Sequence, residues 1–111
     1  MVRFVSSPSV IRSSDALPTS VEEYFGTISS ADDRLTIARI ISPAGWNDEG
    51  CIAKSDMYTI VLKGHLHVKT NGSDILVTKG QGVYVSKGDW LQLGTPFEAT
   101  EYITVIHEDS Q

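Results

Sequence analysis

The chain has 111 residues, of which 41% are hydrophobic and 21% charged, with a net charge of −5 and one cysteine. This length suits one domain with its own core, and no apolar run approaches the ~20 residues that cross a bilayer. The acidic balance disfavours nucleic-acid binding, which requires a basic stripe. One cysteine excludes an internal disulfide, and the first 14 residues lack the apolar core of a secretory signal, so we expect a cytoplasmic protein.

The N-terminal region predicts an arm or edge strand that ends in a short helical turn. Pro8 denies its apolar clusters a place inside a sheet ladder, which favours an edge. Ser20 is followed three residues later by Glu23, the spacing of a capping box, and Gly26 would end the turn. We assign residues 1–26 to this arm.

Beyond the arm, residues 27–107 predict a barrel and residues 108–111 an acidic, frayed tail. Short alternating apolar runs are separated by glycine and proline turns, the pattern of antiparallel strands. The expected strands are Leu35–Ile41, a less regular segment at Trp46–Lys54, Met57–Leu62, His65–Lys69, Asp74–Thr78, Val83–Val85, Trp90–Leu93 and Ala99–Ile106. Asn71-Gly72 carries the strongest hairpin signal. We therefore expect an all-β fold of about eight to ten strands.

The strand at Met57–Leu62 is apolar on both faces, which predicts a strand covered on two sides. One face would fill the barrel, and the other would need the N-terminal arm, a second subunit, or both to cover it. We therefore expect a homodimer.

Two histidines on one strand face, His65 and His67, have the spacing of a metal-binding pair. Because Leu66 and Val68 must take the core face, alternation turns both imidazoles outward, and an exposed structural role is favoured. A reactive thiolate needs a nearby cation or a helix N-terminus, and beyond Lys54 the sequence offers Cys51 neither, which favours a buried small side chain over a nucleophile.

The last histidine, His107, alternates in phase with Ile103 and Val105. We expect this set to point toward the interior of the barrel. His107 is therefore the histidine best positioned to act as an acid, a base or a ligand contact.

The spacing of Gly64, Gly80, Gly82 and Gly88 among short strands resembles that of the cupin superfamily, whose fold is a double-stranded β-helix or jelly roll. The first motif of that family has two histidines, then a glutamate, then a glycine seven residues after the glutamate. With Gly64 as the glycine, the glutamate position is Met57.

The paired histidines of that motif would fall at residues 50–53, where this chain has none. The second motif, Pro-x-Gly-x-x-His, corresponds to residues 86–91, with Ser86 for proline and Leu91 for histidine. The resemblance therefore implies a cupin without metal ligands and without a cofactor.

Among cupins, the chain is most similar to the EutQ type of ethanolamine utilisation. Residues 61–68 and 87–96 resemble that group, including its Gly-Thr-Pro and its loss of the second-motif histidine. The carboxylates that the group carries at the positions of Met57 and Thr59 are absent here. The resemblance thus implies the fold, and not the acetate-kinase activity ascribed to EutQ.

We expect a metal-free, homodimeric cupin that binds a small molecule in the barrel mouth or serves as an interaction module. The expected pocket is apolar with a few polar tips, and its lining residues are Met57, Thr59, Tyr84, Trp90, Leu91, Tyr102 and His107. The alternative interpretation is that these side chains fill a solid core.

A second hypothesis is a metal-independent acid-base enzyme. It would be of isomerase or epimerase type, or would have a EutQ-like activity on a small carboxylate or phosphate. In it His107 and either Tyr102 or Tyr84 would carry protons.

Overall fold

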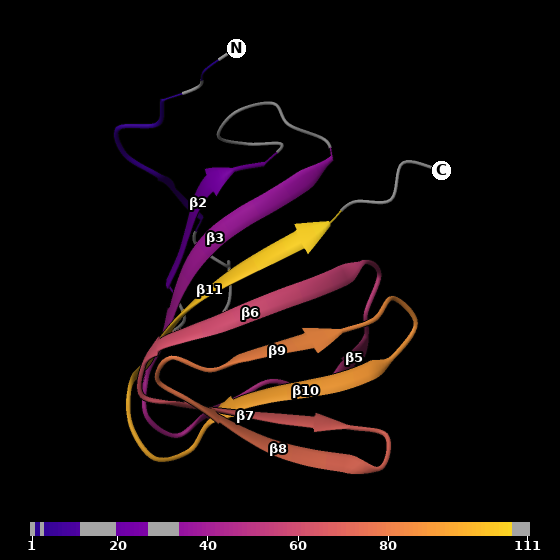
Figure 1. Cartoon of the computed structure of the whole chain (residues 1–111). Helices are drawn as coiled ribbons and strands as arrows, with labels where there is room; N and C mark the ends of the chain where they lie inside the picture. The colour runs from indigo at the N-terminus through magenta and orange to yellow at the C-terminus, as the bar shows by residue number, and fades with distance from the viewer. Residues whose placement is uncertain (1, 3, 12–19, 27–33, 108–111) are drawn as a thin grey trace.

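The computed structural model describes residues 2, 4–11, 20–26 and 34–107, and every regular element among them is a β-strand (Figure 1). The strands are β1 (Ser9–Ile11), β2 (Ser20–Phe25), β3 (Leu35–Ser42), β4 (Trp46–Asn47), β5 (Cys51–Ile52), β6 (Asp56–Lys63), β7 (His65–Thr70), β8 (Ser73–Thr78), β9 (Gly82–Val85), β10 (Trp90–Thr95) and β11 (Thr100–His107). This part of the chain contains no helix long and apolar enough to cross a membrane.

The strands form two antiparallel sheets that face each other (Figure 1). One sheet has the order β1-β2-β3-β11-β6-β9, and the other has the order β4-β10-β7-β8, with β5 also paired to β10. The consecutive strands β8 to β11 alternate between the two sheets, as in a jelly roll. The all-β jelly-roll prediction is confirmed, and the expected hairpin at Asn71-Gly72 joins β7 to β8 with Thr70 opposite Ser73.

The predicted helical turn at Ser20–Phe25 is wrong, because this segment forms strand β2. It pairs with β3 along most of its length, with Val21 opposite Ile40. A capping box stabilises only one isolated turn, whereas the strand gains a full ladder of backbone hydrogen bonds. Tertiary pairing therefore overrides the local pattern.

The N-terminal segment contributes β1, which pairs with β2 and, among the described strands, stands at the edge of its sheet. Pro8 directly precedes this strand, where a missing N–H breaks no ladder bond. The predicted arm also includes residues 12–19, and these, like the predicted tail at 108–111, lie outside the described residues.

Strand β6 has the two apolar faces that its sequence predicts. Thr59 and Val61 are buried between the sheets, whereas Tyr58 and Ile60 on the opposite face are 48% and 53% exposed. The sheet therefore has an apolar outer face as well as an apolar inner one.

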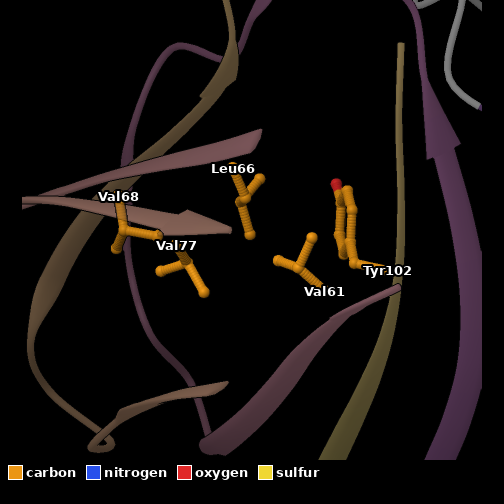
Figure 2. Close-up of a cluster of buried hydrophobic side chains, with 5 residues drawn as sticks. All are labelled: Val61, Leu66, Val68, Val77 and Tyr102. Carbon is orange, nitrogen blue, oxygen red and sulfur yellow. The ribbon is translucent and has the colours of Figure 1, made fainter. Parts of the chain in front are cut away.

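The larger of two core clusters joins side chains from both sheets (Figure 2). Its buried members are Val61, Leu66, Val68, Val77 and Tyr102. Burial raises the pKa of the Tyr102 phenol, whose hydroxyl lies 3.3 Å from the Ser42 hydroxyl. The cluster fills the barrel at the end where β6 turns into β7.

On the outer face of the larger sheet, Arg39 on β3 bridges two acidic side chains of the neighbouring strands. Its Nη1 donates to Glu22 on β2 at 2.6 Å, and its Nε donates to Glu101 on β11 at 2.8 Å. The Arg39 guanidinium lowers the pKa of Glu101. The three charges tie β2, β3 and β11 together across their ladders.

Because the pKa of Glu101 is lower in the folded state than in the unfolded state, its contribution to stability is present above pH ~4.3 and is lost as pH falls through the folded value. The pair is partly exposed, so we expect about 0.2–1 kcal/mol. Between pH 7 and pH 3, the melting temperature of Glu101→Gln should fall by roughly 1–3 °C less than that of the wild type.

Thermal melts followed by circular dichroism at both pH values measure this difference. Glu49→Gln makes the same charge change on an exposed loop and should follow the wild type. Equal falls in melting temperature for wild type and Glu101→Gln would contradict the role of the Arg39 bridge.

Candidate functional site

The positions at which a cupin would hold a metal are occupied here by a second hydrophobic cluster. Ala53, Val85 and Leu91 are its buried members, and Met57 packs against them. Met57 and Leu91 stand at the glutamate and histidine positions of the two family motifs, and Ala53 lies in the segment that would supply the paired histidines. None of these side chains offers a nitrogen or oxygen ligand.

In the described part of the chain, no group of three or more histidine, cysteine, aspartate or glutamate side chains is arranged to hold a metal ion. The two sheets instead close on each other through packed apolar atoms at this end of the barrel.

Two further predicted pocket residues, Thr59 and Tyr102, are buried between the sheets and pair with neighbouring hydroxyls. The Thr59 hydroxyl lies 3.0 Å from that of Thr104, and Tyr102 reaches Ser42. The polar atoms of this part of the interior therefore satisfy one another. Four of the predicted pocket residues thus lie in the packed interior: Met57, Thr59, Leu91 and Tyr102.

The expected inward orientation of His107 is wrong, because this histidine is exposed at the end of β11. The buried residues of β11 are Thr100, Tyr102 and Thr104, one position out of phase with His107. Both faces of β11 carry apolar residues, and its inner face also carries hydroxyl groups. The sequence therefore does not show which face is buried. Alternation alone does not decide which face turns inward.

The other two histidines, His65 and His67, point outward as predicted, because they alternate with the buried residues Leu66 and Val68 along β7. His65 Nδ1 lies 2.9 Å from Glu98 Oε2, and His67 pairs with Asp74. Each imidazole thus has its own carboxylate partner, and the two rings do not share a ligand site.

The prediction that Cys51 is buried is wrong, since its side chain is exposed. It lies on β5, a strand of two residues that pairs with β10.

A cleft of about 230 Å³ lies between the edge strands of the two sheets, β8 and β9. Residues of the β7-β8 turn, both edge strands and the start of β10 line it: Thr70, Asn71, Ser73, Ile75, Val83, Tyr84, Val85, Asp89 and Trp90. Ile75 lies opposite the buried Val68, and yet it is 41% exposed because the barrel is open along this edge.

The cleft combines apolar walls with a negative rim. No lysine, arginine or histidine is among its lining residues. Within the described part of the chain, no hydrogen bond or ion pair engages the Asp89 carboxylate. The Trp90 indole packs on Gly50, where an added Cβ would stand 2.5 Å from Trp90 Cζ2.

A shallow groove of about 330 Å³ lies across β6 and β9 and includes their outer face. The Tyr58 and Tyr84 rings stack there with centroids 4.9 Å apart. Gly82 lies opposite Ile60 on the neighbouring strand, so no side chain covers Ile60 from that side. Tyr84 lines both this groove and the cleft.

Of the seven residues predicted to line a pocket, Tyr84 and Trp90 belong to the cleft. The prediction missed its polar contributors, among them Thr70, Ser73 and Asp89. Asn71-Gly72 and the turn before Trp90 both mark strand ends, and the topology brings these ends together at one rim. That convergence depends on strand pairing, which the sequence pattern does not supply.

No family model matches the sequence. Among curated proteins, the chain is 28% identical over 68 residues to endoribonuclease YbeY of Myxococcus xanthus, a match that covers 61% of this chain and 23% of that protein. The chain thus spans less than a quarter of the length of this relative.

Solved structures resemble the chain more extensively. A putative ethanolamine utilization protein Q (EutQ) from Salmonella typhimurium matches 81% of this chain and 69% of its own, with a TM-score of 0.70 and 17% identity. An RmlC-like cupin from Shewanella frigidimarina matches 98% of this chain and 91% of its own, with a TM-score of 0.76 and 14% identity. The polyketide cyclase RemF from Streptomyces resistomycificus matches 98% of this chain and 81% of its own, with a TM-score of 0.79 and 15% identity.

Proposed function

Since the chain has the cupin fold that it shares with EutQ and RmlC-like proteins, we propose that it is a metal-free cupin that binds a small molecule and acts as a homodimer. The observation that carries the proposal is the hydrophobic cluster of Ala53, Val85 and Leu91 at the family's metal position. It supports a barrel that has kept the fold and lost the metal centre.

A metal-dependent dioxygenase or isomerase needs three or four nitrogen or oxygen ligands that converge on one point. Met57 packs there against the cluster that contains Leu91 instead. A divalent ion placed among these atoms would lose its hydration without gaining ligands, which is strongly unfavourable.

We expect less than about 0.1 metal ion per chain after incubation with iron, manganese, nickel or zinc and exhaustive dialysis, because a site without ligands does not retain ions. Inductively coupled plasma mass spectrometry of the untagged protein measures this ratio. A metal-dependent cupin treated in parallel serves as the positive control. One retained ion per chain would contradict the metal-free assignment.

The small-molecule site that we propose is the cleft between β8 and β9, in place of the barrel interior. The interior positions are packed, whereas the cleft offers an open apolar surface with a few polar groups, the usual composition of a ligand site. EutQ and RemF are named for ethanolamine utilization and polyketide cyclisation, so related barrels are associated with small organic molecules.

The homodimer that we propose uses the outer face of β6 and β9. Tyr58, Ile60, Leu62 and Tyr84 are exposed there, and such a contiguous apolar surface marks an interaction site on a soluble protein. A second copy is the partner we favour, since two such faces are chemically matched and a two-fold axis brings the same patch of each subunit together. Burial of this face would complete the cover that β6 lacks.

The acid-base hypothesis loses its proton carrier. It required His107 inside the barrel beside Tyr102, and His107 is exposed. Burial raises the pKa of the Tyr102 phenol, and its hydroxyl lies within hydrogen-bonding distance of the Ser42 hydroxyl. Tyr102 is therefore a poor proton donor near neutral pH.

A further inference from the structure

We infer that the cleft between β8 and β9 selects small organic ammonium compounds. The inference rests on the proposed small-molecule function and names the chemical class that the cleft recognises. Three properties of the lining carry it: an uncommitted carboxylate, an aromatic side chain at the next residue, and the absence of any cationic side chain among the lining residues.

The carboxylate belongs to Asp89, at the tip of the turn that leads into β10. Its backbone is held on both sides, because Asp89 N donates to the Ser86 carbonyl at 3.0 Å and Ala53 N donates to the Asp89 carbonyl at 2.8 Å. Its side chain engages no partner among the described residues. A fixed backbone with an uncommitted anion is positioned to pair with a ligand cation, and it would repel a ligand anion.

The aromatic face belongs to Trp90, the next residue along the chain. The indole is half-buried and packs against Gly50, so its position is restricted before a ligand arrives. Tryptophan is the best partner for an ammonium group among aromatic side chains, and quaternary ammonium ligands are commonly held on such faces. Asp89 and Trp90 both line the cleft, which thus contains a charge partner and an aromatic partner for a bound ammonium group.

The remaining walls limit the rest of the ligand. Ile75, Val83 and Val85 form an apolar wall, and Thr70 and Ser73 supply hydroxyl groups at the β7-β8 turn. The cleft of about 230 Å³ is smaller than the ~300–1,000 Å³ of drug-sized pockets. It therefore suits a compact ammonium ion with a short apolar or hydroxylated body, and it excludes a nucleotide or a large sugar conjugate.

The test compares three probes of nearly the same shape: choline, its uncharged analogue 3,3-dimethylbutan-1-ol, and the anion 3,3-dimethylbutanoate. Each is titrated into the ¹⁵N-labelled full chain, and binding is followed by ¹H–¹⁵N correlation spectra. We expect choline to shift the Asp89 amide and the Trp90 indole resonance, with an affinity at least about fivefold above that of the alcohol.

Asp89→Asn keeps the shape of the side chain and removes its charge, and it should weaken choline binding about tenfold. Glu98→Gln is the matched control, because it makes the same charge change on the loop at the opposite end of β10 and should leave binding unchanged. Raising the salt concentration should weaken choline binding in the wild type and have little effect in Asp89→Asn.

The outcomes separate the inference from the function on which it rests. If the alcohol or the carboxylate shifts the cleft resonances as strongly as choline, the ammonium inference is wrong and the small-molecule site stands. If none of the three probes shifts them, both are contradicted. If choline binds equally to wild type and Asp89→Asn, Asp89 is not the recognition group and the inference falls.

Discussion

Ile60→Glu is expected to convert a dimer of about 24 kDa into a monomer of 12.1 kDa. Ile60 lies on the outer face of β6, is 53% exposed and stands between Tyr58 and Leu62 on that face. A carboxylate placed there would be desolvated without a cation in the dimer, which costs several kcal/mol. The dimer dissociation constant should rise by more than about 100-fold.

Size-exclusion chromatography with light scattering, over a range of protein concentrations, measures the mass. Leu76→Glu is the matched control: Leu76 is 45% exposed, but it lies on the outer face of the other sheet. This variant should remain dimeric. A monomeric wild type, or dissociation by Leu76→Glu instead of Ile60→Glu, would contradict the proposed interface.

Gly64→Ala should destabilise the fold by roughly 3 kcal/mol or more, because two independent costs coincide at this turn. Gly64 has φ +90°, a conformation that alanine adopts only with strain. An added Cβ would also stand 2.7 Å from the Ala99 carbonyl oxygen and 2.9 Å from Thr100 Cα. These are backbone atoms of the neighbouring segment, and they cannot rotate away.

Gly72→Ala separates the two costs. Gly72 has φ +89°, but an added Cβ there meets nothing within 4 Å. It should cost about 1–2 kcal/mol, and chemical denaturation of the two variants measures the difference. Equal losses would mean that the close approach to Thr100 contributes nothing. The turn geometry thus explains why a glycine stands at position 64, the glycine position of the first cupin motif, without reference to a metal.

The features of the fold that the sequence predicts correctly have strong local signals. Asn71-Gly72 specifies a two-residue turn, and the hairpin forms there. The two-faced pattern of β6 requires apolar cover on both sides, and both faces are apolar in the structure. Leu66 and Val68 set the orientation of β7, because the residues that alternate with them are polar and the core takes the apolar face.

Prediction fails where a long-range contact decides between two local possibilities. The segment Ser20–Phe25 has a helix-capping pattern, but pairing with β3 makes it a strand. The two faces of β11 carry similar amounts of apolar surface, so the sequence does not reveal that Tyr102 and Thr104 turn inward and His107 does not. Each choice depends on neighbours more than ten residues away.

The candidate site was predictable only in part for the same reason. Trp90 and Tyr84 stand out as aromatic residues near strand ends. Asp89, Thr70 and Ser73 look like ordinary turn residues until the topology brings two turns to one rim. The cleft is a property of two sheet edges that face each other, and neither edge carries it alone.

The open edge between β8 and β9 also determines what holds the two sheets together there. The two strands are consecutive in the chain but belong to different sheets, and no ladder joins them. The turn between them is fastened to β6, where Gly80 N donates to the Val61 carbonyl at 2.8 Å. Side-chain packing holds the two strands together instead, because Val83 on β9 packs against the buried cluster that contains Val77 on β8. A substitution that removes this packing should therefore open the edge without breaking an interstrand hydrogen bond.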